Sequence, residues 1–454
     1  MYFFILLFIV FIAIISLKIF KQDILSPSFI SAIAFAFSFI CAIVGMFSWN
    51  YVRNLEITTI LIFILGIFFF FYGEYLCRKI FFKNHKEIST KELNSKKKYN
   101  LVKISRPILI LMLIFAIITT SLLISEIIRV CREYGFQSSS FKDILAYYRT
   151  KSSLFSSDAY TSTIKVNFIV KQMQKVCNVI NITLAVYSVN KLFNIKSIKK
   201  INIVNFLLIL ITIIICLLQT VLFNGGRSIM FHFIVGYIGI FMFYYFIIYK
   251  RKFNRKILYS SIILLVSIVG IYYLMLPLLG RSTKHDFIKY STFSFGTPIS
   301  SLNLYIQQDD SHSKKIGEET FTGVYYTLNK IGVIEYTEPQ THEWYSYAPG
   351  GTLSSNTFTS LRSYYKDFGL CGVIILQFIF GFLITLFYLK MKYSNLQLLH
   401  IIYFNYFYIL IEQIRDEQFF SLFNISNVAN LLIIITIYIV LILLQERRIK
   451  HEQN

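Results

Sequence analysis

A very short turn between two strongly apolar segments carries the most informative polar residues of the chain. The turn reads Asn224-Gly225-Gly226-Arg227-Ser228. Gly225 and Gly226 allow the backbone to bend tightly and to expose its N–H groups. Arg227 stands at the start of the next predicted helix, where a cation does not complement the positive end of the helix dipole. A bound phosphate would explain it, because guanidinium and helix N-terminus both bind phosphate; the alternative is a turn arginine that reaches lipid headgroups.

Three further arginines, Arg281, Arg362 and Arg415, stand at the ends of apolar segments. Groups able to act as general bases accompany them, namely His285, Asp286, Glu335, His342, Glu343, Asp367 and Glu412. Charges close to a bilayer core are costly and are therefore functional candidates. Together these residues predict a cationic site with a nearby base, although each arginine taken alone could be an interfacial anchor.

Two lysines stand near the start of another apolar segment. Lys171 and Lys175 are four residues apart, so a helix places them on one face. Gln172, Gln174, Asn178 and Asn181 continue the polar character along the same segment. We therefore expect this helix to face a hydrated cavity rather than lipid. The alternative is a span that starts only near Val176, after an interfacial turn.

The sequence predicts no metal site and no cofactor. None of the six cysteines forms a CxxC pair, and most lie within or beside apolar runs, as expected of buried thiols. Asp309-Asp310-Ser311-His312 resembles a metal site only superficially, because one carboxylate pair with one histidine on a polar loop is typical of solvated surface.

The elements that must position these residues are transmembrane helices. The chain has 454 residues, of which 56% are hydrophobic and 15% charged, against about a quarter charged in soluble proteins. A helix needs about 20 apolar residues to cross the hydrocarbon core. The sequence therefore predicts an all-α, polytopic bundle of about eleven spans that forms a single integral membrane domain over 1–454. The predicted spans are 2–20, 27–47, 57–77, 107–128, 167–190, 203–222, 229–249, 257–279, 369–389, 398–418 and 424–444.

The distribution of lysine and arginine predicts the orientation. The net charge is +22, and basic residues concentrate in alternate connections, which is a topology signal rather than a sign of nucleic-acid binding. The positive-inside rule then predicts an N-terminus outside the cell and a cytoplasmic C-terminus. Two long segments, 129–166 and 280–368, lie on the outer face in this topology. Within the second, 316–335 predicts an amphipathic helix at the interface.

Four short stretches follow one another on the predicted outer face: Phe223-Asn224-Gly225-Gly226-Arg227-Ser228, Gly280-Arg281, Gly317-x-x-Thr320-Phe321 and Tyr364-x-x-Asp367-Phe368-Gly369-x-x-Gly372. In this order and on this face, they resemble bacterial oligosaccharide repeat-unit polymerases, the Wzy-type O-antigen or capsule polymerases. The span count and the single dominant outer loop extend the likeness over most of the chain. The resemblance implies a GT-C-like glycosyltransferase of the bacterial inner membrane, which works without a metal on undecaprenyl-pyrophosphate-linked oligosaccharides. A chain-length regulator would be a further partner.

The implied reaction cuts the growing chain from its lipid pyrophosphate and transfers it to a hydroxyl group of the incoming unit. The negative charge that grows on the leaving pyrophosphate calls for positioned cations, and the hydroxyl needs a base. The expected pyrophosphate ligands are Arg227 and Arg281, with Arg362 or Arg415 as a further clamp. Gly225, Gly226, Lys171 and Lys175 are expected to bind substrate as well. His285 or His342 is the expected base, with Asp286 and Asp367 as other catalytic candidates.

Three other functions remain open from the sequence. An O-antigen-ligase-like transferase would use similar arginines but move finished polymer to another acceptor. A lipid-linked oligosaccharide flippase would need cations on both sides of the membrane midplane, whereas the candidates here cluster outward. A structural scaffold would need neither intramembrane lysines nor a Gly-Gly-Arg turn.

Overall fold

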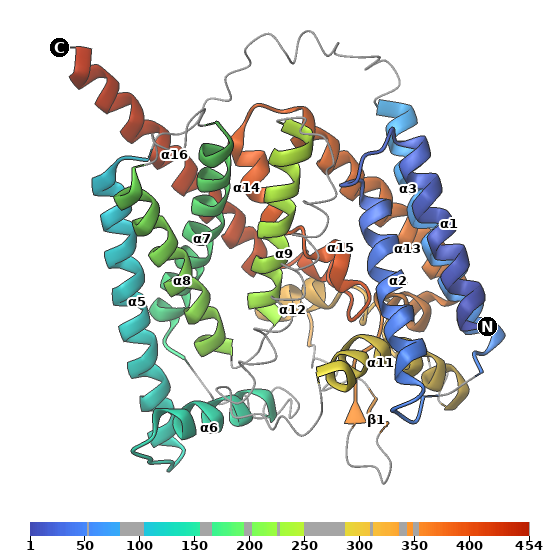
Figure 1. Ribbon diagram of the computed structural model, residues 1–454. Helices are drawn as coiled ribbons and strands as arrows, with labels where there is room; N and C mark the ends of the chain where they lie inside the picture. Colours follow the sequence, from blue (N-terminus) through green and yellow to red (C-terminus); the bar gives the residue numbers. More distant parts are fainter. Residues whose placement is uncertain are drawn as a thin grey trace. The chain divides into compact units, whose positions relative to one another are not determined.

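The computed structural model is almost entirely helical in the part of the chain that it describes (Figure 1). The described residues are 1–51, 54–81, 104–154, 166–194, 202–224, 228–248, 287–308, 312–335, 343–347 and 354–453. Within them, eight helices are long and apolar enough to cross a bilayer. These are α1 (Tyr2–Ile19), α2 (Pro27–Gly45), α3 (Ile57–Phe81), α5 (Arg106–Glu133), α8 (Ile203–Asn224), α9 (Ser228–Met242) with its π-helical continuation η2 (Phe243–Ile248), α13 (Ser360–Tyr393) and α16 (Ile425–Gln453). The chain is therefore an all-α, multi-pass membrane protein.

The other elements are mostly shorter. They are α6 (Phe141–Leu154), α7 (Phe168–Asn194), α11 (Phe287–Gln308), α12 (Thr322–Lys330), α14 (Gln397–Asn405), α15 (Ile409–Glu412) and the 3₁₀ helix η5 (Phe420–Leu422). Two strands, β1 (Tyr345–Ser346) and β2 (Ser354–Ser355), pair antiparallel, with Tyr345 opposite Ser355.

Several boundaries differ from those predicted. The predicted tenth span 398–418 is divided into α14 and α15, and the predicted interfacial helix 316–335 is reduced to α12. Gly317 and Gly332 flank α12 with φ of +77° each, a left-handed conformation that ends helices. The predicted eighth span 257–279 lies outside the described residues.

The contacts divide the chain into two compact units. Unit 1 comprises Met1–Lys97, His285–Tyr393 and Ile409–Asn427. Its main contact joins α3 and α13 along their lengths. A Cβ atom on Gly73 would lie 2.3 Å from the Phe378 carbonyl oxygen, and one on Gly381 would lie 2.1 Å from the Phe70 carbonyl oxygen. These small residues let two parallel backbones approach closely, as in many membrane helix pairs.

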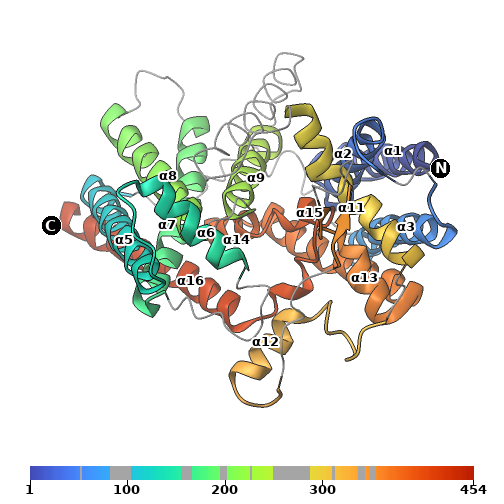
Figure 2. The same ribbon diagram turned by 90° about the horizontal axis from the view of Figure 1, so that it is seen from below.

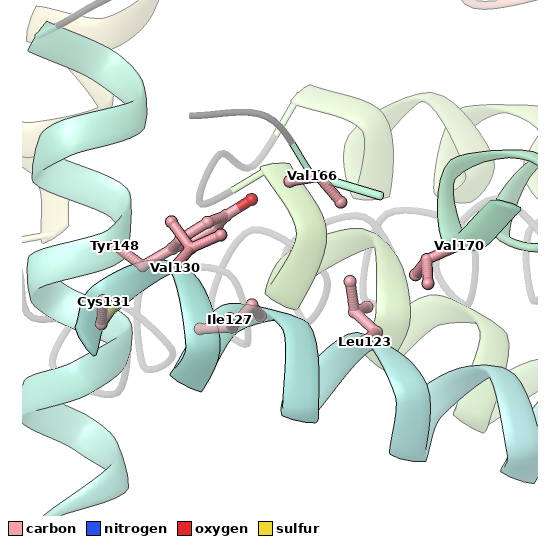
Figure 3. Close-up of a cluster of buried hydrophobic side chains, with 7 residues drawn as sticks. All are labelled: Leu123, Ile127, Val130, Cys131, Tyr148, Val166 and Val170. Carbon is pink, nitrogen blue, oxygen red and sulfur yellow. The ribbon is translucent and has the colours of Figure 1, made fainter. Parts of the chain in front are cut away.

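Unit 2 comprises Lys98–Lys284, Ser394–Tyr408 and Val428–Asn454. In it α7 contacts α5, α8, α9 and α14, and Figure 2 shows α5, α7 and α8 grouped together. Leu184, Ala185 and Val186 of α7 are all buried, so α7 is a central helix of the unit. Short α6 lies across one end of α5 (Figure 1). A buried cluster joins them to the start of α7 (Figure 3), made of Leu123, Ile127, Val130, Cys131, Tyr148, Val166 and Val170.

Candidate functional site

The helices of unit 1 have two chemically different ends. At one end, the loop residue Asp23 accepts a hydrogen bond from Lys392 at the end of α13 (2.6 Å) and from Arg78 at the end of α3 (3.2 Å). Since α3 and α13 run parallel, both helices begin at the opposite end. We call these the Asp23 end and the Arg362 end, because Arg362 lies in the first turn of α13.

Arg362 is the most deeply buried cation of the described residues, with only 1% of its surface exposed. Its Nη1 atom donates to Glu319 at 2.9 Å, and its Nη2 atom donates to Glu343. The guanidinium group also lies 4.4 Å from the ring centre of Phe358 and 4.8 Å from that of Tyr305. Paired charges and aromatic faces together offset the cost of burying this cation.

Lys366 lies one helical turn after Arg362 and shares both of its carboxylate partners. Its Nζ atom is 3.1 Å from Glu319 and 3.0 Å from Glu343. Arg362, Lys366, Glu319 and Glu343, which we call the Arg362 cluster, thus contain two cations and two carboxylates. Two like charges one turn apart repel each other on an isolated helix, and the carboxylates from other segments remove this repulsion.

Glu343 is the most accessible carboxylate of the cluster, because 27% of its side chain is exposed. Partial burial alone would raise its pKa, but the charges of Arg362 and Lys366 outweigh burial and hold the pKa of Glu343 below its ordinary value. Glu343 is therefore an ionised, partly accessible carboxylate at neutral pH.

Asp367, predicted as a catalytic residue, fixes the loop that carries Glu319. Its carboxylate accepts hydrogen bonds from the backbone N–H groups of Thr320 (2.7 Å) and Glu319 (3.3 Å) and from the Ser313 hydroxyl group. The chain turns just before Glu319 at Gly317, whose backbone has the left-handed conformation (φ of +77°). These three bonds are all made to the loop that carries Glu319, so Asp367 is placed to orient Glu319 toward Arg362.

The residue that follows Glu343 in the sequence is an exposed aromatic one. Trp344 follows Glu343 directly and is 58% exposed. The next residue, Tyr345, begins strand β1 and stacks edge-on against Phe358, which also contacts Arg362. A large exposed ring that directly follows a member of the cluster in sequence offers a flat apolar face on which a sugar ring could stack.

A second acidic turn lies at the same end of unit 1. The Ser360 N–H donates to the Gln413 carbonyl oxygen at 2.9 Å, which attaches α13 to the segment after α15. In that segment Arg415, a predicted clamp, lies 3.6 Å from Glu412. Glu417 accepts backbone hydrogen bonds from Phe419, Phe420 and Ser421. Burial raises the pKa of Glu417 to about 8, although those N–H groups oppose the shift.

Seven predicted site residues lie outside the described residues. They are Gly225, Gly226, Arg227, Arg281, His285, Asp286 and His342. Lys171 and Lys175 belong to unit 2, where Lys171 is exposed and Lys175 is partly buried on α7. Helix α7 is continuous from Phe168 through both lysines. Its polar character continues inward, where Asn181 accepts a hydrogen bond from Tyr237 of α9.

The sequence reasoning missed Glu319 and Lys366 as members of the site. The spacing of Arg362 and Lys366 was a usable signal, because two cations one turn apart call for nearby carboxylates. Nothing in the sequence, however, indicated which of the acidic residues would supply them.

The described residues contain no group of three or more His, Cys, Asp or Glu side chains placed to hold a metal ion. The described side chains at the Arg362 end are two paired cations, two carboxylates and the exposed ring of Trp344. No family model, curated protein or solved structure matches this chain.

Proposed function

We propose that this protein is a polymerase that joins polyprenyl-pyrophosphate-linked oligosaccharide units into a surface polysaccharide on the outer face of a bacterial cell membrane. The proposal includes about eleven spans in a GT-C-like arrangement, an outer N-terminus and a cytoplasmic C-terminus. It also includes a glycosyl transfer in which arginine and lysine side chains, rather than a metal ion, neutralise the leaving pyrophosphate.

The observation that carries the proposal is the Arg362 cluster next to exposed Trp344. The cluster lies at the end of unit 1 opposite Arg78 and Lys392, which are part of the basic connections. By the positive-inside rule the basic end faces the cytoplasm, so the cluster would face the outside. A sugar-binding ring and ionised groups on that face suit a lipid-linked saccharide whose carbohydrate part is outside the cell.

In the proposed reaction, a hydroxyl group of the incoming unit attacks the anomeric carbon of the growing chain. The bond from that carbon to the pyrophosphate oxygen breaks, and the hydroxyl proton passes to a base. Glu343 is the best-placed base among the described residues, since it is ionised and partly accessible. Arg362 and Lys366 would hold its carboxylate in place, while His285, Asp286 and His342 remain alternative bases.

The leaving pyrophosphate would be bound by Arg227 and Arg281, with Arg415 as a further clamp. Arg362 has a modified role in this proposal. Because both carboxylates already occupy its guanidinium group, it would position Glu343 rather than grip phosphate, unless the substrate displaces one partner.

The test is to incubate the purified protein in lipid vesicles with a lipid-pyrophosphate-linked repeat unit and to separate the products by size. We expect a ladder of lipid-linked oligomers. Replacement of Arg227 or Arg281 by Ala should abolish the ladder while the protein remains in the membrane. Transfer to a second acceptor without elongation would instead indicate a ligase, and unchanged substrate that moves across the vesicle membrane would indicate a flippase.

A further inference from the structure

A cavity of about 440 Å³ lies in unit 2, where the last turn of α5 meets the first turn of α6. Its polar lining comes from Arg132, Gln137, Ser138 and Ser139, and its apolar lining includes Ile128 and Ile144. This volume lies within the range of small-molecule sites. The site is distinct from the Arg362 cluster, which belongs to unit 1.

The backbone around the cavity is fixed by a defined helix ending. Gly135 has φ of +75°, its N–H donates to the Arg132 carbonyl oxygen at 2.9 Å, and the Phe136 N–H donates to the Cys131 carbonyl oxygen at 3.0 Å. This pair of bonds is a Schellman motif, for which glycine is the preferred residue. The motif turns the chain back, so that residues 136–139 form one wall of the cavity.

Side-chain contacts tie the two helices on either side of the cavity together. The Cys131 thiol donates to the Ile144 carbonyl oxygen at 3.5 Å, and the rings of Phe136 and Tyr147 stack with centres 4.3 Å apart. Buried Tyr148 joins the apolar cluster under α6 (Figure 3). The cavity is therefore preformed rather than a gap between loosely packed loops.

Of the residues that line the cavity, Arg132 alone carries a charge, and that charge is positive. Arg132 is exposed, and within the described part of the chain its guanidinium group has no ion-pair or hydrogen-bond partner. Two carboxylates of the same helix, Glu126 and Glu133, both pair with Arg129. Asp143 accepts a hydrogen bond from the Ser138 hydroxyl group. Arg132 thus places a guanidinium group that pairs with none of these carboxylates beside the hydroxyl and amide groups of the lining.

The cavity also lies where lipid headgroups are expected. Helix α5 is one of the eight apolar spans, and α6 lies across its end (Figure 1). Helix α6 is amphipathic, since Leu145 and Tyr148 are buried while Lys142 and Asp143 are exposed. Such helices lie in the plane of the membrane interface.

We propose that this cavity binds a phosphate ester of a small polyol. Arg132 would bind the phosphate oxygens, and Gln137, Ser138 and Ser139 would hydrogen-bond the polyol hydroxyl groups. The source would be either an anionic phospholipid such as phosphatidylglycerol or a soluble ester such as glycerol 3-phosphate. This inference does not depend on the proposed polymerase activity.

The experiment uses the full-length, delipidated protein in a neutral detergent and compares the wild type with Arg132→Gln. Phosphatidylglycerol, phosphatidylcholine and glycerol 3-phosphate are each titrated and followed by native mass spectrometry. Lys142→Gln is the matched control, because Lys142 is an exposed cation one residue into α6 that does not line the cavity. Thermal unfolding checks that both variants fold, as expected for exposed side chains.

If the ligand is a lipid, the wild type and Lys142→Gln should bind phosphatidylglycerol in preference to phosphatidylcholine, and Arg132→Gln should bind it at least about tenfold more weakly. If the ligand is soluble, the same pattern should be seen with glycerol 3-phosphate. Equal binding of all three probes by Arg132→Gln and wild type, or no binding by the wild type, would overturn the proposal.

Discussion

Arg362 and Glu319 form an ion pair at 2.9 Å between two side chains that are each almost completely buried. The two residues are on different segments, α13 and the loop before α12. Burial of such a pair costs desolvation free energy, which is recovered only when both partners and their remaining hydrogen-bond sites are satisfied. The pair therefore fixes the loop against the helix. Loss of Arg362 would leave Glu319 with Lys366 as its remaining cation, and loss of Glu319 would leave Arg362 with Glu343.

Replacement of Arg362 by Ala should destabilise the protein by about 3–5 kcal/mol, because it leaves Glu319 buried without its main partner. Unfolding in detergent by heat or denaturant would measure this. The double variant Arg362→Met with Glu319→Leu should be less destabilised than the sum of the two single variants. Simple additivity would show that the two side chains do not interact in the folded protein.

Trp344 should matter for activity and not for stability. Since more than half of its surface is exposed, Trp344→Ala should change the free energy of unfolding by no more than about 0.5 kcal/mol. We expect polymer formation to fall at least tenfold, about 1.4 kcal/mol of binding. Trp344→Phe, which keeps a stacking ring, is the matched control and should keep most of the activity. Full polymer from Trp344→Ala would exclude this ring as a sugar contact.

Gly369 should resist substitution for conformational reasons alone. It has φ of +62° and ψ of −158° at the kink in α13, a region open essentially only to glycine, and a Cβ atom there would contact nothing within 4 Å. Gly369→Ala should therefore cost about 1–3 kcal/mol of stability. The exposed neighbour Cys371, changed to Ala, is the control and should be nearly neutral. Equal stability of the two variants would mean that the kink is not strained for alanine.

Glu417 should make stability fall as pH rises. Its pKa is raised to about 8 in the folded protein, against about 4.3 in an unfolded chain. Between these two values the folded state keeps the proton of Glu417 where the unfolded state has lost it. The contribution of Glu417 to stability is therefore fully present below about pH 4.3 and is lost progressively up to about pH 8. In Glu417→Gln, the midpoint of unfolding should change less with pH between about pH 4.3 and pH 8 than it does in the wild type. An unchanged pH profile in this variant would show that another group is responsible.

The sequence predicted the class of the protein correctly because membrane helices depend on local composition. Long apolar runs and basic connections predicted an all-α, multi-pass bundle, and eight of the described helices satisfy the length and hydropathy of a span. Helix boundaries were less accurate. Gly369 was read as the start of a span, whereas α13 begins at Ser360 and passes through Gly369 at a kink. Residues 360–368 contain Arg362, Lys366 and Asp367, so a search for apolar runs does not include this first part of α13.

The candidate site was predictable only in part. Arg362 was selected because a cation at the end of a span is costly, and that argument needs no tertiary information. Its partner Glu319 is distant in sequence, and the pairing depends on how the loop before α12 folds onto α13. Asp367 illustrates the same limit, because its residue type does not indicate the hydrogen bonds that it accepts from the backbone N–H groups of Glu319 and Thr320. Its predicted catalytic role stays a prediction.

The central claim is that the reactive face lies at the Arg362 end of unit 1. The most direct test compares two carboxylate variants, Glu343→Gln and Asp23→Asn, in the vesicle assay with a lipid-pyrophosphate-linked repeat unit. Both carboxylates are held by two cations, at opposite ends of the same unit. We expect Glu343→Gln to form no ladder and Asp23→Asn, once its folded fraction is taken into account, to form one. A wild-type ladder from Glu343→Gln would contradict the assignment of the Arg362 cluster to catalysis.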